Sequence, residues 1–442
     1  MNTMSSLKKA ILPIHLWAIA VGLVISGEYF GWNYGWGVAG TVGFLIATFI
    51  ITILYLTFIF SFTELTTSIP HAGGPFAYSH RAFGPIGGLI AGYATVVEFL
   101  LATPAIAFAL GSYIHFLYPA LPVLWTAIAF YVALTGVNML GIKESALFSL
   151  VITLLAVLEL LIYMGIVAPA FKASNFLHDA MPFGIKGVFA ALPFAIWLYV
   201  CIEGIAMVAE EVKDPEKNIP KGYISGILTL MLLAIGVMVL TGGITDWKSL
   251  SGIDYPLPES IGIVLGRHNN ITRIFAGIGL FGLLASFNGI IISYSRQLFA
   301  LSRSRYLPEG LSKLSRKHQT PDRALIAGGL LGIVALCLGR TDQLVLLSVL
   351  GAVVMYILSM VALFILRKKE PDLPRPFKVP GYPWVPLVAL LLSILSLVAI
   401  IYYNVMLSLL FFAGMGLTLI VFLLAGKHKQ TQEDITLYQL PS

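Results

Sequence analysis

Charged side chains are scarce in this sequence of 442 residues. Lys, Arg, Asp and Glu together make up 11% of the chain, whereas hydrophobic residues make up 58%. A soluble domain carries roughly 25% charged residues, and the mean hydropathy of +0.91 is also that of a membrane protein. These values exclude a soluble protein. A transmembrane helix needs about 20 apolar residues, so about twelve spans would leave room for short loops only.

Cysteine is equally scarce, because the chain has only two. Cys201 and Cys337 both fall inside apolar runs, which excludes a disulfide framework and a zinc site. We therefore expect neither a metal nor a cofactor. The net charge of +6 is spread in small clusters with no continuous basic face, which argues against nucleic acid as a partner.

Twelve apolar runs divide the chain. They cover residues 11–36, 38–68, 86–115, 120–140, 146–168, 186–209, 222–245, 272–302, 324–340, 342–366, 384–404 and 405–426. The first run is too long and too rich in glycine for a cleaved signal peptide. If the N-terminus is cytoplasmic, about 20 of the 27 Lys and Arg residues lie on the cytoplasmic side, as the positive-inside rule requires. The sequence predicts a multi-pass protein of the cell (inner) membrane with both termini in the cytoplasm.

Two of the runs contain small residues and a carboxylate near their middle. The first has Ser26-Gly27-Glu28, and the sixth has Cys201-Ile202-Glu203-Gly204. Glycine weakens a helix by about 1 kcal/mol relative to alanine, and irregular backbone at membrane depth is tolerated only where it lines a cavity. Interrupted helices at matching positions of two halves are typical of inverted-repeat transporters. The alternative is that the glycines only allow close helix packing.

We therefore predict an all-α integral membrane protein of about twelve helices, in which helices 1 and 6 are broken at the midplane. Residues 11–168 would form the first inverted repeat and residues 186–366 the second. Residues 384–426 would form two peripheral helices, and residues 427–442 a cytoplasmic tail. The oligomeric state stays open between a monomer and a homodimer.

Four motifs in order resemble the amino acid/polyamine/organocation permease superfamily. They are residues 69–78 (Ile-Pro-His-Ala-Gly-Gly-Pro-Phe-Ala-Tyr), 214–221 (Asp-Pro-Glu-Lys-Asn-Ile-Pro-Lys), 295–300 (Ser-Arg-Gln-Leu-Phe-Ala) and 375–383 (Arg-Pro-Phe-Lys-Val-Pro-Gly-Tyr-Pro). The resemblance covers nearly the whole chain. It implies a secondary transporter with the five-plus-five, leucine-transporter-like fold.

The first helix departs from the pattern of that superfamily. There the break usually has Gly-Ser-Gly followed by an aliphatic residue, and its free N–H groups hold the carboxylate of the substrate. This chain has Ile25-Ser26-Gly27-Glu28, and a Glu28 carboxylate would repel a substrate carboxylate. An amine without a carboxylate fits better. Residues 25–32, Ile-Ser-Gly-Glu-Tyr-Phe-Gly-Trp, resemble the ethanolamine permease branch, and this resemblance names ethanolamine as the substrate.

Four intramembrane glutamates are the main candidates for a functional role. We expect Glu28 to be the counter-ion of a substrate ammonium, unless it snorkels to the outer water. Glu203 matches a position where proton-coupled relatives often carry glutamate, so it is a candidate to bind the amine, to take up a proton or to hold the unwound backbone. The resemblance aligns Glu98 with the pocket wall. Glu159 is either structural or part of a proton path.

Other side chains near the breaks complete the predicted site. Trp197 matches the gating aromatic of the superfamily, and a ring face near an ammonium contributes about 0.5–2 kcal/mol. Ser286 and Asn288 are expected to face the first helix. The predicted substrate-binding residues are Ser26, Gly27, Glu28, Tyr29, Glu98, Thr103, Trp197, Tyr199, Cys201, Glu203, Ser286 and Asn288.

The leading hypothesis is therefore import of ethanolamine by alternating access, and the same fold carrying an amino acid or a polyamine is the alternative. A membrane enzyme is disfavoured, because the sequence has no His/Asp metal cluster, no Gly-x-Ser-x-Gly elbow and no phosphate loop. A receptor that binds without net transport stays open. Coupling to H⁺, coupling to Na⁺ and transport driven by the potential alone also stay open, since one protonated amine gains about 2.3 kcal/mol per 100 mV.

Overall fold

The computed structural model describes residues 11–71, 73–140, 146–315, 317–318 and 320–426. Within these ranges the regular elements are helices, and the one bridge between extended segments joins Ile11 to Val212. The predicted cytoplasmic tail and the N-terminal lysines lie outside the described residues. The all-helical architecture agrees with the sequence prediction.

Nine helical segments of the described chain are long and apolar enough to cross a membrane. They lie in α3 (Tyr34–Ser68), α5 (Pro85–Leu117), α7 (Ala146–Val167), α9 (Gly184–Trp197) continued by η2 (Ile202–Glu211), α10 (Pro215–Gly242), α12 (Asn270–Arg303), α14 (Thr341–Lys369), α15 (Trp384–Tyr403) and α16 (Val405–Leu424).

Three shorter helices occupy the places of the remaining predicted spans: α1 (Pro13–Val24), α6 (Val123–Met139) and α13 (Asp322–Leu338). The structure therefore has a helical segment at each of the twelve apolar runs. The connecting elements are α2 (Ser26–Tyr29), α4 (Pro75–Phe83), η1 (Ala168–Ala170), α8 (Ala173–Phe176), η3 (Trp247–Ser249), α11 (Pro256–Leu265) and η4 (Glu309–Ser312).

The first two spans do not separate where the apolar runs suggested. The helix α3 begins at Tyr34, inside the predicted first run, and changes direction at Gly40, where φ is 71°. Residues 34–39 therefore continue the first span, and residues 41–68 form the second. No charged residue lies between Glu28 and Glu64, so the sequence does not mark this boundary.

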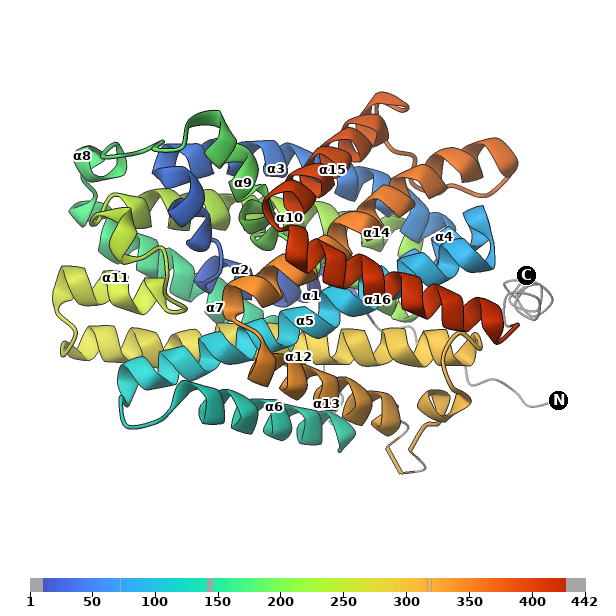
Figure 1. Cartoon of the computed structure of the whole chain (residues 1–442), viewed down its shortest axis with the longest axis horizontal. Helices are drawn as coiled ribbons and strands as arrows, with labels where there is room; N and C mark the ends of the chain where they lie inside the picture. The colour runs from blue at the N-terminus through green and yellow to red at the C-terminus, as the bar shows by residue number, and fades with distance from the viewer. Residues whose placement is uncertain (1–10, 72, 141–145, 316, 319, 427–442) are drawn as a thin grey trace.

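The helices run roughly side by side along the long axis of the molecule (Figure 1). The short helix α4 lies at one end of the bundle, and α8 and α11 lie at the other. In the interior α3 packs on α9, α5 packs between α12 and α14, and α1 packs on α10. Half of the residues of the last helix, α16, are exposed.

A buried ion cluster at the α4 end links three segments. The Glu64 side chain at the end of α3 is 2% exposed, and it accepts hydrogen bonds from Arg367 at 2.8 and 2.6 Å and from the Val379 backbone N–H at 2.7 Å. The Arg375 Nε atom lies 3.5 Å from the same carboxylate. Breaking a buried pair by removing one partner costs about 3–5 kcal/mol. The motif at residues 375–383 therefore anchors the connection to α15.

Candidate functional site

The first span is interrupted at the predicted place and again one turn later. The helix α1 ends at Val24, Ile25 makes a tight turn in which its carbonyl accepts from the Glu28 N–H at 3.0 Å, and Ser26–Tyr29 forms the short helix α2. The sequence analysis missed the second interruption: the backbone becomes extended at Phe30 (φ −162°, ψ 172°) and has φ +91° at Gly31, a left-handed conformation that a glycine adopts without strain.

The sixth span is interrupted where the sequence predicted. The helix α9 ends at Trp197, and the chain turns through the next four residues. Cys201 has φ +74°, and the span continues as the 3₁₀-helix η2. A non-glycine residue in this left-handed region costs about 1–2 kcal/mol, and such strain clusters at functional sites.

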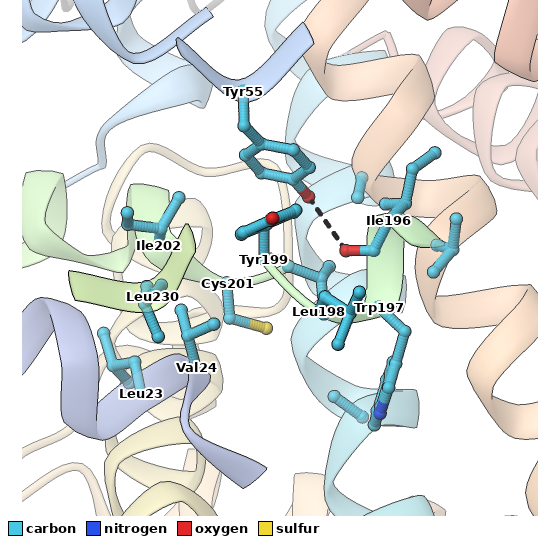
Figure 2. Packing of buried hydrophobic residues seen from close by; sticks show 14 of the residues in the cluster. Leu23, Val24, Tyr55, Ile196, Trp197, Leu198, Tyr199, Cys201, Ile202 and Leu230 are labelled. Atoms are coloured by element: carbon cyan, nitrogen blue, oxygen red, sulfur yellow. Dashed lines mark hydrogen bonds between the residues drawn. The ribbon is translucent and has the colours of Figure 1, made fainter. Parts of the chain in front are cut away.

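The two breaks are in direct contact. A Cβ atom on Gly27 would lie 2.5 Å from the Trp197 carbonyl oxygen, so only glycine allows this approach. The Trp197 Nε1–H donates to the Phe30 carbonyl at 3.0 Å, which satisfies an acceptor freed by the first break. Figure 2 shows Leu23 and Val24 of α1 beside the turn that contains Cys201. The breaks therefore form one packed unit, and Trp197 closes it.

Glu28 is the acid nearest this unit, and it is buried without a partner. Its side chain has no exposure, and neither carboxylate oxygen has a hydrogen-bond partner among the described residues. The alternative that Glu28 snorkels to the outer water is therefore wrong. An isolated buried carboxylate is costly unless a cation or a proton accompanies it.

Glu98 and Glu203 face each other. Each acid is among the groups that act on the other, and the Cys201 backbone acts on both. Both side chains have no exposure. The Tyr356 hydroxyl donates to Glu203 Oε2 at 3.3 Å, and the other three oxygens of the pair have no donor within the described chain. The structure thus places Glu98 against another acid, where the sequence suggested only a pocket wall.

Glu159 belongs to a separate group. The Tyr29 hydroxyl donates to Glu159 Oε2 at 2.8 Å, and the Tyr113 hydroxyl donates to the Tyr29 carbonyl at 3.2 Å. Glu159 is 3% exposed. These bonds tie the first span to the third and the fifth. The Tyr29 side chain is therefore hydrogen-bonded to Glu159 and does not point toward the contact between the two breaks.

The remaining predicted residues divide between two locations. Ser286 faces the first helix as expected: its hydroxyl donates to the Leu23 carbonyl at 2.6 Å and contacts the Ser26 hydroxyl at 2.7 Å. Asn288 instead accepts a hydrogen bond from Asn138 of α6 at 2.7 Å.

Thr103 and Tyr199 also bond to neighbouring helices. The Thr103 hydroxyl lies 2.6 Å from the Tyr131 hydroxyl of α6, and the Tyr199 hydroxyl lies 2.9 Å from that of Thr52 in α3. Thr103 therefore faces the fourth span, away from the position expected for a pocket wall.

Two tyrosines that the sequence analysis missed join the carboxyl pair. Tyr55 of α3 and Tyr356 of α14 share a hydrogen bond of 2.8 Å, and the Tyr55 hydroxyl also reaches the Ile196 carbonyl at 3.4 Å, as Figure 2 shows. The sign in the sequence that could have identified these two tyrosines is a polar hydroxyl within an apolar span.

A cap of loop residues covers the other side of the first break. The Asn33 side chain accepts from the Gly31 N–H at 3.0 Å and donates to the Leu250 and Ile253 carbonyls at 2.6 and 2.8 Å. Asp254 accepts from Tyr34 and from Thr341, the latter at 2.9 Å. The connection between α10 and α12 thus closes over the break.

No group of three or more His, Cys, Asp or Glu residues that would hold a metal occurs in the described part of the chain. A bundle of apolar helices with two broken spans packed around buried, unpartnered acids defines a membrane transporter rather than an enzyme.

Comparison with known proteins identifies the family. Residues 13–425 match the family described as amino acid permease, and the chain belongs to it. It is 30% identical to an uncharacterized transporter of Rhizobium meliloti (strain 1021) over 87% of this chain and 85% of that protein. It is 28% identical to the branched-chain amino acid permease BcaP of Bacillus subtilis (strain 168) over 87% of both.

A third relative has a different printed substrate. The methylthioribose transporter of Bacillus subtilis (strain 168) is 26% identical over 87% of both chains. None of these three relatives is named as an ethanolamine permease, so the names give no support to ethanolamine in particular. The chain is a multi-pass secondary transporter of the amino acid permease family and not an enzyme.

The contact between the breaks generates a prediction about Gly31. A Cβ atom there would lie 2.4 Å from Trp197 Nε1, and the backbone φ of +91° strains any other residue. We expect Gly31→Ala to lower the midpoint of thermal unfolding in detergent and to abolish transport. The matched control is Gly136→Ala, where nothing lies within 4 Å. Equal midpoints for the two variants would contradict the proposed packing.

Proposed function

We propose that this protein imports a small organic amine, with ethanolamine as the leading candidate. The observation that carries the proposal is Glu28: a fully buried carboxylate beside the two breaks, with no partner for either oxygen among the described residues. A substrate ammonium would supply the missing charge. The aromatic rings of Phe30 and Trp197, whose centroids are 5.6 Å apart, lie at the adjoining break, where a ring face would add cation–π attraction.

The charge balance of the interior favours an amine over a zwitterion. Glu28, Glu98, Glu159 and Glu203 are all buried, and no Lys, Arg or His is among the groups that perturb these four in the described structure. A substrate carboxylate would add another negative charge near Glu28 and would be repelled.

An amino acid is the second candidate, and the names of the relatives favour it. The serine/threonine exchanger SteT of Bacillus subtilis (strain 168), at 25% identity over 74% of this chain, is named for amino acids as BcaP is. A zwitterion fits if its ammonium pairs with Glu28 and its carboxylate lies elsewhere. A polyamine is a further member of the amine class.

The transport cycle that fits this architecture is alternating access around the unit of the two breaks. We retain the division into repeats at residues 11–168 and 186–366 as part of the proposal. The four acids have little or no exposure, so the substrate enters and leaves by movement of the broken spans. The Ile11 N–H bonds to the Glu211 carbonyl at 3.1 Å, which favours joint movement of the start of α1 and the end of η2.

The substrate proposal is tested by uptake of radiolabelled ethanolamine into proteoliposomes. Removing one member of a buried charge pair costs about 2–5 kcal/mol, so Glu28→Gln should weaken the apparent affinity at least about 30-fold. The control is Glu309→Gln, an exposed acid in η4, which should leave uptake unchanged.

Competition by unlabelled solutes separates the candidates. We expect ethanolamine to compete best, and alanine, putrescine and choline to compete weakly. Strong competition by alanine together with full ethanolamine affinity in Glu28→Gln would contradict the amine proposal and favour the amino acid.

We also propose that the α4 end of the bundle faces the cytoplasm. In a Cys337→Ser background the remaining Cys201 is buried, so introduced thiols report accessibility. A membrane-impermeant maleimide should label Gly252→Cys, in the connection that caps the first break, in intact cells. It should label Glu309→Cys only after the membrane is opened. The reverse pattern would invert the proposed topology.

A further inference from the structure

Glu159 of α7 is a buried glutamate that the amine proposal does not use. Its side chain is 3% exposed. Its Oε2 atom accepts a hydrogen bond from the Tyr29 hydroxyl at 2.8 Å, and its Oε1 atom has no hydrogen-bond partner in the described part of the chain. Tyr29 follows Glu28 in the sequence, and both belong to the short helix α2. Glu159 is therefore bonded to the segment that carries the proposed ammonium site.

The helix α2 cannot set its own orientation. It has four residues, and the span is interrupted at Ile25 before it and at Phe30 and Gly31 after it. Isolated helices shorter than about 12 residues are marginal, so the rotation of α2 depends on contacts with other helices. Neighbouring side chains on a helix differ in direction by about 100°. Once the direction of Tyr29 is fixed, the direction of Glu28 is fixed as well.

The Tyr29 hydroxyl has one hydrogen to donate, and Glu159 is the better placed of its two acceptors. The distance of 2.8 Å to Glu159 is the usual one for a hydrogen bond between oxygens, whereas the Ala156 carbonyl lies at 3.3 Å. A Cβ atom on Gly282 would lie 2.6 Å from the Tyr29 hydroxyl oxygen, so α12 packs directly on this group. The Tyr113 hydroxyl of α5 holds the Tyr29 carbonyl at 3.2 Å. The acceptor that directs the Tyr29 side chain is therefore Glu159.

The Glu159 carboxyl is itself fixed by packing. A Cβ atom on Gly279 would lie 3.0 Å from Glu159 Oε1 and 3.0 Å from Cε1 of the Tyr113 ring, so α12 lies directly against the carboxyl. A binding group is held precisely when packing and hydrogen bonds lock the side chains that support it. Glu159 meets this requirement, because α12 confines it and it in turn holds Tyr29.

We propose that Glu159 is a positioning residue for the amine site. Through Tyr29 it fixes the rotation of α2, and it thereby directs Glu28 toward the contact between the two breaks. Glu159 does not touch the substrate and acts on it only through Tyr29 and Glu28. This inference rests on the proposed function, because it takes Glu28 as the group that holds the substrate ammonium.

The KM for ethanolamine uptake into proteoliposomes tests this role, because KM does not depend on the amount of folded protein. Tyr29→Phe keeps the ring and removes the hydroxyl, whereas Glu159→Leu removes the acceptor. Loss of a buried hydrogen bond changes an equilibrium about tenfold, and we expect each variant to raise KM by about this factor. Glu159→Gln keeps an acceptor oxygen for Tyr29, so its KM should stay close to that of the wild type.

Tyr163→Phe is the matched control. Tyr163 is also a buried tyrosine of α7, but its hydroxyl bonds to Thr241 of α10 at 2.6 Å and not to α2. This variant should leave KM unchanged. A wild-type KM in Tyr29→Phe would overturn the proposal. A KM in Glu159→Gln as high as that of Glu28→Gln would also overturn it, because Glu159 would then act through its charge as a ligand of the ammonium.

A double variant separates positioning from a general loss of structure. If Tyr29 acts only through Glu28, adding Tyr29→Phe to Glu28→Gln should raise KM no further, because the effects of coupled residues are not additive. Two increases in KM that multiply would show that Tyr29 acts independently of Glu28, and the positioning role would be wrong.

A labelling measurement does not depend on the substrate. The chain has two cysteines, so Glu28→Cys combined with Cys201→Ser and Cys337→Ser leaves one thiol, and its rate of reaction with methyl methanethiosulfonate reports the direction of residue 28. Adding Tyr29→Phe or Glu159→Leu should change this rate several-fold, and adding Glu159→Gln should not. Equal rates in all these proteins would overturn the positioning role. If the rates differ as expected but wild-type protein takes up no ethanolamine, the substrate proposal fails while the positioning of residue 28 by Glu159 stands.

Discussion

A carboxylate in the interior of a membrane protein needs a positive partner or a proton, and this constraint shapes the centre of the bundle. Four glutamates lie inside the described helices with little or no exposure, and the basic residues that act on acids lie at the ends of the bundle instead. At the α4 end Glu64 forms ion pairs with Arg367 and Arg375, so its negative charge is neutralised within the protein. The four central glutamates have no such arginine partner. In our account the positive charge that compensates them comes from the transported solute.

The contact between the two broken spans forms the candidate site beside these acids. Trp197 bonds across to the carbonyl of Phe30, and Gly27 brings the first span against the turn of the sixth. The backbone groups freed by one break are thus satisfied partly by the other. Glu28 lies beside this contact, and Glu203 lies within the sixth span just past its turn. A movement of the two broken spans would change the surroundings of both acids at once.

Hydropathy predicted the elements of this fold well, because each span must be apolar along its length. The interruption of the sixth span was also predictable, since Glu203 and Gly204 stand out in an apolar run. In the first span the same reasoning located the interruption at Ile25 but not the second one at Phe30 and Gly31. The fit of Gly31 against the Trp197 ring depends on packing between distant segments.

The partners of the acids could not be predicted from sequence. Glu98 and Glu203 meet only because α5 packs beside η2 through α14 and α12, and a pocket-wall role for Glu98 did not suggest an acid opposite it. Asn288 and Thr103 face α6 for the same reason: the rotation of a helix is set by its neighbours, and a nearly uniform apolar sequence does not encode it strongly.

The most direct test is the number of charges that move with each substrate molecule. Current and isotope flux measured together on proteoliposomes, with an inward proton gradient and a fixed potential, give this ratio. Our account predicts at least one positive charge per ethanolamine, that of the ammonium held by Glu28. A ratio of zero would contradict it.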